Sequence, residues 1–254
     1  MSDTLVIIPT YNERENVEAI SAAALATRAA PDLLFVDDGS PDGTGGILDR
    51  LAAANPRLHV LHRTRKEGLG RAYVAGFRWA LERPYRFVFE MDADFSHNPN
   101  DIPKLRDAAE SADLVLGSRF YGGIRIINWP LSRLMLSQAA ALYVRLITGL
   151  PMADPTGGFK CYRRAVLESM NLDRIGSNGY SFQIETLHHA WFNGFRVLEI
   201  PIIFEERRLG TSKMNLSIIR EALWVVWKLA LRSRGRRRPR SARAPRAAAG
   251  DAAP

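Results

Sequence analysis

The first half of the chain alternates short, continuously apolar runs with stretches of helical periodicity, and no other feature limits its possible folds so strongly. The apolar runs are residues 5–8, 33–36, 58–61, 87–91 and 114–116. Helical patterns lie between them, near residues 14–28, 44–54, 69–82 and 99–110. Strands that are apolar on both faces, each followed by a helix, are typical of a parallel sheet covered by helices on both sides. We therefore predict an α/β fold with a mostly parallel central sheet.

Polar and acidic residues directly follow four of the predicted strands. They are P-T-Y-N-E (9–13), D-D-G-S (37–40), D-A-D (92–94) and G-S-R (117–119). Ligands of open α/β sheets bind beyond the carboxyl ends of the strands. We therefore expect these four segments to meet at one crevice.

The second half of the chain has a different pattern, without internal repeats. We predict a helix near 130–148, a Gly/Pro-rich loop at 151–160, a helix near 181–193, a strand pair within 195–206 and a last, amphipathic helix at about 215–232. Residues 233–254 consist mainly of Arg, Ala and Pro, a composition that cannot bury a core and predicts disorder. This predicts one domain over residues 1–232, followed by a tail.

The net charge of +8 is concentrated in that tail. Residues 232–254 hold eight arginines against one acidic residue, Asp251, which leaves the rest of the chain close to neutral. Such a tail suits either nucleic acid or anionic lipid. The single cysteine, Cys161, excludes an intrachain disulfide, and no signal peptide or run of about 20 apolar residues is found. We expect a cytoplasmic protein without transmembrane helices.

Asp92 and Asp94 are the strongest candidates for metal ligands. They lie one residue apart, directly after the apolar run at 87–91. Carboxylates at this spacing suit Mg²⁺ or Mn²⁺ that also binds phosphate oxygens. A D-x-D triplet also occurs in ordinary solvated turns, but its place after a buried strand favours the metal site.

Two further segments are candidates for nucleotide binding. Asp38 ends the second strand, where an acidic side chain can contact a ribose or a base. The segment that follows it, 39–44, is typical of a turn that caps the next helix. Gly68 and Gly70 open another helix, where small residues let backbone N–H groups approach a diphosphate.

The order of these motifs resembles the family 2 glycosyltransferases of GT-A fold. The segments VIIPTYNEREN (6–16), FVDDGSPDGT (35–44), KEGLGRA (66–72) and MDADFSHNP (91–99) are each similar to donor-site segments of that family. The later segments GSRF (117–120), NWPLSR (128–133), DPTGGFK (154–160), FQIE (182–185) and RRLGTSKM (207–214) resemble polyprenyl-phosphate (dolichyl-phosphate) mannose synthases. The resemblance spans about residues 4–215.

The resemblance implies a complete set of site residues. The nucleoside would be held by Pro9, Tyr11, Glu13, Val36 and Asp38. The metal and diphosphate would be held by Asp92, Ala93 and Asp94, and phosphates of donor and acceptor would be met by Arg119, Arg133, Arg207 and Lys213. Asp94, Arg119 and Arg133 would be the catalytic residues, the two arginines by binding the acceptor phosphate. Ser96 stands where some relatives carry a metal-binding Gln, and it would offer a hydroxyl or a bound water. Glu185 would act either as a base or by positioning a loop or the sugar, and the role of Asp154 stays open.

The resemblance also implies an activity. It is the inverting transfer of mannose from GDP-mannose to a polyprenyl monophosphate, with Mg²⁺ or Mn²⁺ as cofactor. The alternatives are a UDP-glucose or other UDP-sugar donor, and a membrane- or nucleic-acid-binding module that acts through the basic tail. Because the acceptor is a lipid, we expect peripheral contact with the cytoplasmic face of a membrane through 129–150 and 216–231, or a membrane-anchoring subunit. We expect no nucleic acid partner.

Overall fold

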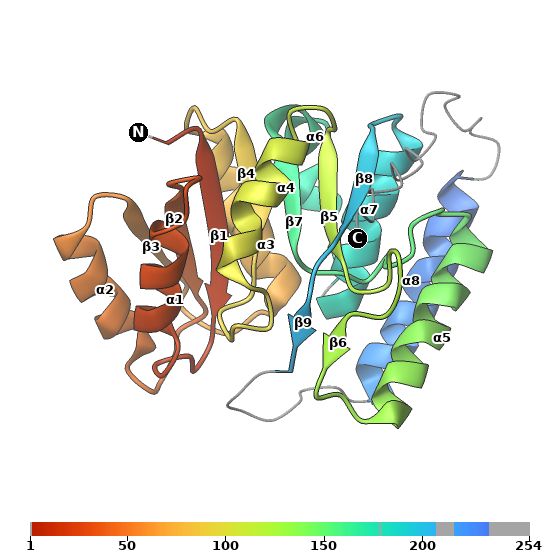
Figure 1. Cartoon of the computed structure of the whole chain (residues 1–254), viewed down its shortest axis with the longest axis horizontal. Helices are drawn as coiled ribbons and strands as arrows, with labels where there is room; N and C mark the ends of the chain where they lie inside the picture. The colour runs from red at the N-terminus through yellow and green to blue at the C-terminus, as the bar shows by residue number, and fades with distance from the viewer. Residues whose placement is uncertain (1, 178, 207–215, 234–254) are drawn as a thin grey trace, which may run out of the picture.

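The predicted α/β architecture is present in the computed structural model, which describes residues 2–177, 179–206 and 216–233. A seven-stranded sheet has the order β3-β2-β1-β4-β7-β5-β8 (Figure 1). Its strands are β1 (Thr4–Thr10), β2 (Asp32–Asp37), β3 (Leu58–His62), β4 (Phe87–Glu90), β5 (Leu114–Ser118), β7 (Lys160–Arg163) and β8 (Val197–Pro201). All of these strands except β7 run parallel to one another. Each of the five predicted apolar runs therefore forms a strand of the main sheet.

Two features of the second half differ from the prediction. Strand β7 was not predicted, and it lies antiparallel between β4 and β5. Its sequence, K-C-Y-R, does not read as a central strand because two of its four residues are charged. Two strands lie within 195–206 as predicted, but the prediction that they pair with each other is wrong. β8 joins the main sheet beside β5, whereas β9 (Phe204–Glu205) pairs with β6 (Ile126–Ile127) in a separate two-stranded sheet.

Helices cover both faces of the main sheet. They are α1 (Val17–Leu25), α2 (Thr44–Ala54), α3 (Leu69–Leu81), α4 (Ile102–Ala108), α5 (Leu131–Thr148), α6 (Arg164–Glu168), α7 (Gly179–Phe192) and α8 (Leu216–Ser233), with short 3-10 turns at Pro99–Asp101 and Leu172–Arg174. Alternate residues of a strand face opposite sides, so Leu5 and Ile7 pack with α3 and α7, while Val6 and Ile8 pack with α1 and α4. Two apolar cores therefore enclose the sheet.

Helices α5 and α8 form a pair at one end of the sheet (Figure 1). α8 also packs on α7, which connects the pair to the rest of the domain. None of the described helices is both long enough and apolar enough to cross a membrane.

Close packing of α3 on the sheet fixes the position of its first turn. A β-carbon on Gly76 would lie 2.7 Å from Cγ2 of Ile7, so the helix rests directly on β1 at this point. Because residue 76 has no side chain, α3 packs closely on β1, and its N-terminus lies at the edge where the parallel strands end.

Candidate active site

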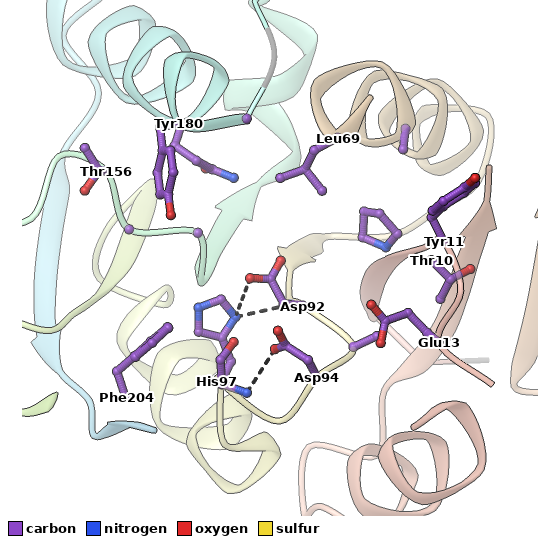
Figure 2. A pocket seen from close by; sticks show the side chains of 18 of the residues that line it. Thr10, Tyr11, Glu13, Leu69, Asp92, Asp94, His97, Thr156, Tyr180 and Phe204 are labelled. Atoms are coloured by element: carbon purple, nitrogen blue, oxygen red, sulfur yellow. Dashed lines mark hydrogen bonds and ion pairs between the residues drawn. The ribbon is translucent and has the colours of Figure 1, made fainter. Parts of the chain in front are cut away.

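A cavity of about 580 Å³ opens at the carboxyl ends of the strands. Its walls include the segments that follow β1, β2, β4 and β5, which confirms that the four polar strand ends meet at one crevice. Figure 2 shows Asp92 and Asp94 in the middle of this cavity, with Tyr11 on one side and Tyr180 on the other. The first turns of α3 and α7 and the loop before β7 complete the lining.

The D-x-D segment forms a tight turn whose carboxylates border the cavity. Phe95 has a φ of 60°, and the backbone N–H of Ser96 donates a hydrogen bond to Oδ1 of Asp94 at 3.1 Å. Ala93 and the buried Ser96 also line the cavity. Among the described residues there is no group of three or more acidic, His or Cys side chains that could hold a metal ion. Two carboxylates without a third protein ligand suit a Mg²⁺ or Mn²⁺ ion that takes its other ligands from phosphates and water.

His97 also lines the cavity and supports this turn, a role that the sequence did not reveal. Its Nδ1 accepts a hydrogen bond from the backbone N–H of Asp92 at 3.2 Å, and its ring stacks on Phe159 with centroids 5.1 Å apart. Burial lowers the pKa of His97 to about 4, although the negative charge of Asp94 opposes the shift. The ring is therefore neutral and acts as a hydrogen-bond acceptor near neutral pH. Its place within D-A-D-F-S-H was the only available signal.

The side of the cavity formed by β1 and β2 contains most of the residues expected to hold a nucleoside. Pro9, Tyr11, Glu13 and Asp38 all line it. Val36 is the exception, because its side chain is completely buried in the core and does not reach the cavity.

Two basic residues that the sequence did not single out also belong to this side. Nζ of Lys66 lies 3.8 Å from the centre of the Tyr11 ring, and Lys66 lines the cavity. Arg63 donates a hydrogen bond to Asp38 and also pairs with Glu67. The carboxylate of Asp38 therefore has a cation beside it.

The N-terminus of α3 faces the same cavity. Gly68 precedes the helix with a φ of 100°, a conformation that favours glycine, and both Gly68 and Leu69 line the cavity. Free backbone N–H groups and the helix dipole make such a terminus favourable for phosphate. Of the two glycines expected to let backbone N–H groups approach a diphosphate, Gly68 lines the cavity, whereas Gly70 is buried and does not.

Arg119 and Asp154 form a buried ion pair at the opposite side. Their side chains are 7% and 0% exposed. Nε and Nη2 of Arg119 donate to the two carboxylate oxygens of Asp154 at 2.7 and 2.6 Å, and Nη2 also donates to Thr156 at 2.8 Å. Burial raises the pKa of Asp154, but the charge and hydrogen bonds of Arg119 outweigh it, so the pKa lies below its usual value. Most of the donors of Arg119 are therefore already engaged.

Arg133, in the first turn of α5, also borders the cavity and also has a carboxylate partner. It forms an ion pair with Glu206, and its guanidinium lies 4.2 Å from the ring centre of Trp129. Trp129 and Glu206 line the cavity as well. Arg207 and Lys213, which were expected to meet phosphates, lie outside the described residues.

Glu185 lies in α7 and is not part of the cavity lining. Its carboxylate accepts a hydrogen bond from Ser177, which precedes the helix, and lies 3.9 Å from Nη1 of Arg232 in α8. This geometry favours the interpretation that Glu185 positions a loop rather than acting as a base.

Comparisons with known proteins identify the family. Residues 5–170 match the family described as Glycosyl transferase family 2. The chain belongs to this family. The family and its GT-A fold were both predicted from the sequence, and both are confirmed.

The glycosyltransferase has curated relatives along nearly its whole length. It is 51% identical to the polyprenol monophosphomannose synthase of Mycolicibacterium smegmatis, covering 91% of this chain and 88% of the relative. It is 48% identical to the undecaprenyl-phosphate mannosyltransferase of Micrococcus luteus, covering 92% and 97%. It is also 35% identical to the dolichol-phosphate mannosyltransferase of Pyrococcus furiosus, covering 88% of this chain but only 62% of the relative.

Solved structures share the fold at much lower sequence identity. Glucosyl-3-phosphoglycerate synthase of Mycobacterium tuberculosis, in complex with Mn²⁺, UDP and phosphoglyceric acid, matches with a TM-score of 0.65 and 18% identity. The match covers 89% of this chain and 78% of that one. At this identity the likeness establishes the fold alone.

Proposed function

We propose that this glycosyltransferase transfers mannose from GDP-mannose to a polyprenyl monophosphate, with inversion at the anomeric carbon. The observation that carries the proposal is one cavity with the Asp92 and Asp94 carboxylates in the middle and two arginines, Arg119 and Arg133, on one side. The names of the relatives at 51% and 48% identity supply the sugar and the class of acceptor. A donor diphosphate fits at the acidic turn, and an acceptor phosphate fits at the arginines.

On the donor side, the residues of this chain would bind and orient the nucleoside and the diphosphate of GDP-mannose. Tyr11 and Asp38 would contact the nucleoside, and the N-terminus of α3, after Gly68, would donate backbone hydrogen bonds to the diphosphate. Asp92 and Asp94 would hold Mg²⁺ or Mn²⁺, which when bound neutralises charge on the leaving diphosphate.

On the acceptor side, the reaction needs a cationic clamp rather than a strong base. A phosphate monoester has a second pKa near 6, so it is mostly dianionic at neutral pH and can attack directly. A phosphate oxygen forms the new bond to the anomeric carbon while the bond to the diphosphate breaks, and the nucleoside diphosphate leaves. Arg133 would bind the acceptor phosphate by exchanging its partner Glu206 for it. Arg119 would add its buried positive charge and its remaining amino group, Nη1.

A peripheral membrane location at the cytoplasmic face follows from the lipid acceptor, and α5 and α8 offer a surface for it. Large apolar side chains that are 45% to 73% exposed gather on these two helices: Leu131, Met135, Leu136, Leu142, Leu146, Leu223, Trp224, Trp227 and Leu231. Arg145, Lys228 and Arg232 are exposed on the same helices. Aromatic and basic residues next to apolar ones favour the headgroup region of a bilayer. A membrane-anchoring subunit would use the same surface.

One experiment distinguishes the proposed transfer reaction from the competing function, a binding module that acts through the basic tail. Purified chain is incubated with radiolabelled GDP-mannose, a polyprenyl monophosphate in detergent and Mg²⁺ or Mn²⁺, and the labelled lipid is extracted. We expect transfer that Asp94→Asn lowers at least a hundredfold and that deletion of residues 234–254 leaves within about twofold. Transfer that is unaffected by Asp94→Asn would contradict the proposed site. Tail-dependent binding of nucleic acid without transfer would favour the binding module.

A further inference from the structure

A group of buried polar residues lies directly behind the cavity wall, and neither the sequence prediction nor the proposed chemistry uses it. Lys160 of β7 and Glu90 of β4 face each other in neighbouring strands, with 3.9 Å between Nζ and Oε2, and both side chains are completely buried. The hydroxyl of Tyr162 donates to Oε1 of Glu90 at 2.8 Å. Thr186 and Gln183 of α7 complete the group. We refer to these five residues as the buried polar cluster.

Lys160 determines which way the amide of Gln183 is turned. Nζ donates to the backbone carbonyl of Gln183 at 2.9 Å, to the side-chain Oε1 of the same residue, and to Thr186 at 3.1 Å. An ammonium group only donates, so it can be faced only by the amide oxygen. The amide nitrogen of Gln183, Nε2, therefore points away from Lys160. One of its two N–H groups interacts with Glu90, and the second is turned to the other side.

That other side is the cavity. Gln183 lines it, although the residue is only 3% exposed. A β-carbon on Gly158 would lie 3.6 Å from Nε2 of Gln183 and 4.0 Å from Oδ2 of Asp92. The amide donor and a carboxylate of the acidic turn thus border the same small space, which stays open because residue 158 has no side chain. If the diphosphate binds at Asp92, the sugar is the next group of the donor and comes to lie beside Gln183.

We propose that Gln183 is a specificity-determining residue that donates a hydrogen bond from Nε2 to a hydroxyl of the donor sugar. Lys160 is its positioning residue, because it holds the amide in the donating orientation. This inference rests on the proposed function, since it takes the cavity as the donor site.

The cost of the buried charges supports a functional reason for them. Burial lowers the pKa of Lys160 to about 8, with the charge of Glu90 opposing the shift, and burial raises the pKa of Glu90. A buried ion pair is often no more stable than an apolar pair of the same volume. Nζ of Lys160 and Oε2 of Glu90 are 3.9 Å apart, too far for a hydrogen bond, so the pair is not optimised for stability alone. Fixing the orientation of one amide at the cavity explains why the charge is retained.

The test compares sugar recognition with nucleotide recognition. Dissociation constants are measured by calorimetry for GDP, GDP-mannose and the four monodeoxy analogues of GDP-mannose, in the presence of Mg²⁺. Gln183→Met is close in shape but cannot donate, and Lys160→Met removes the group that orients the amide. Thr186→Val is the matched control, because it removes another hydrogen-bond partner of Lys160 without changing a residue that lines the cavity.

We expect the wild-type chain to bind one deoxy analogue roughly tenfold more weakly than GDP-mannose, the factor of about one neutral hydrogen bond. Gln183→Met should lose this discrimination at that hydroxyl while its affinity for GDP stays within about twofold. Lys160→Met should lose most of it, and Thr186→Val should retain it even if the fold is less stable.

Two results would overturn the inference. One is a Gln183→Met variant that still discriminates at every hydroxyl. The other is a wild-type chain that binds GDP-mannose and all its analogues equally. Because binding is measured without the acceptor, a chain that passes this test but transfers nothing to a polyprenyl phosphate would contradict the proposed function and leave the role of Gln183 standing.

Discussion

Asp154→Asn should destabilise the fold by about 3–5 kcal/mol, because it leaves the charge of Arg119 buried without a counter-ion. The two side chains are 7% and 0% exposed, and two hydrogen bonds of 2.7 and 2.6 Å join them. In the variant, an amide NH₂ would replace one oxygen that accepts from the guanidinium, so a hydrogen bond is lost together with the charge. Water can compensate little on the side of Asp154, since that carboxylate is completely buried.

A double-mutant cycle measures how far the two residues depend on each other. Arg119→Met alone should also destabilise the fold, since it leaves the carboxylate of Asp154 without its cation. The double variant Arg119→Met/Asp154→Asn buries no charge, so its loss should be smaller than the sum of the single losses by about 2 kcal/mol or more. The free energy of unfolding is measured by urea denaturation at pH 7. Additive losses, or a loss below about 1 kcal/mol for Asp154→Asn, would refute the conclusion that the pair is a coupled unit.

Three further predictions concern the cavity and the buried polar cluster. Gly158→Ala should fold normally, because a β-carbon there meets its neighbours no nearer than 3.5 Å, whereas Gly157→Ala would place one 2.9 Å from a leucine side chain. The transfer rate of the Gly158→Ala variant should fall at least tenfold, measured with saturating acceptor, because the methyl group fills space next to the donor sugar. An unchanged rate would show that the sugar lies elsewhere. Glu206→Gln should lower the KM for polyprenyl phosphate severalfold, because it frees Arg133 from its ion pair, and a raised KM would contradict this. Burial lowers the pKa of Lys160 to about 8, from an ordinary value of 10.5, so between these pH values the unfolded chain binds the extra proton. The stability of the wild type relative to Lys160→Met should therefore increase as pH rises from 8 to 10, by at most about 1.4 kcal/mol per unit, and a decrease in urea unfolding experiments would contradict the sign.

The sequence was sufficient for the parallel part of the sheet and for the acidic side of the cavity. Continuous apolar runs mark buried parallel strands, and the residues after them necessarily meet at one edge, which brought Tyr11, Asp38 and Asp92 together. Strand β7 escaped prediction because Lys160 and Arg163 make it look exposed, although Lys160 is neutralised by a residue 70 positions earlier. Local patterns carry no information about such a distant partner.

The carboxylate partners of Arg119 and Arg133 could not be predicted for the same reason, because they are distant in the sequence. The motif containing Arg119 suggested a phosphate ligand, but the buried carboxylate of Asp154 engages most of its donors. Gln183 lies in a segment that resembles the mannose synthases, yet only the contact with Lys160 shows which way its amide is turned. The role of His97 follows only from the hydrogen bond that its ring accepts from the acidic turn.

Donor and acceptor choice is the central claim, and one measurement tests it most directly. Purified chain is given equal concentrations of GDP-mannose and UDP-glucose, labelled with different isotopes, together with a polyprenyl monophosphate and Mg²⁺ or Mn²⁺, and the anomeric configuration of the lipid product is determined by NMR. We predict a polyprenyl-phosphate mannose with β configuration, formed from GDP-mannose at least a hundred times faster than any product from UDP-glucose. Transfer from UDP-glucose at a comparable or higher rate, or an α-linked product, would contradict the proposed reaction.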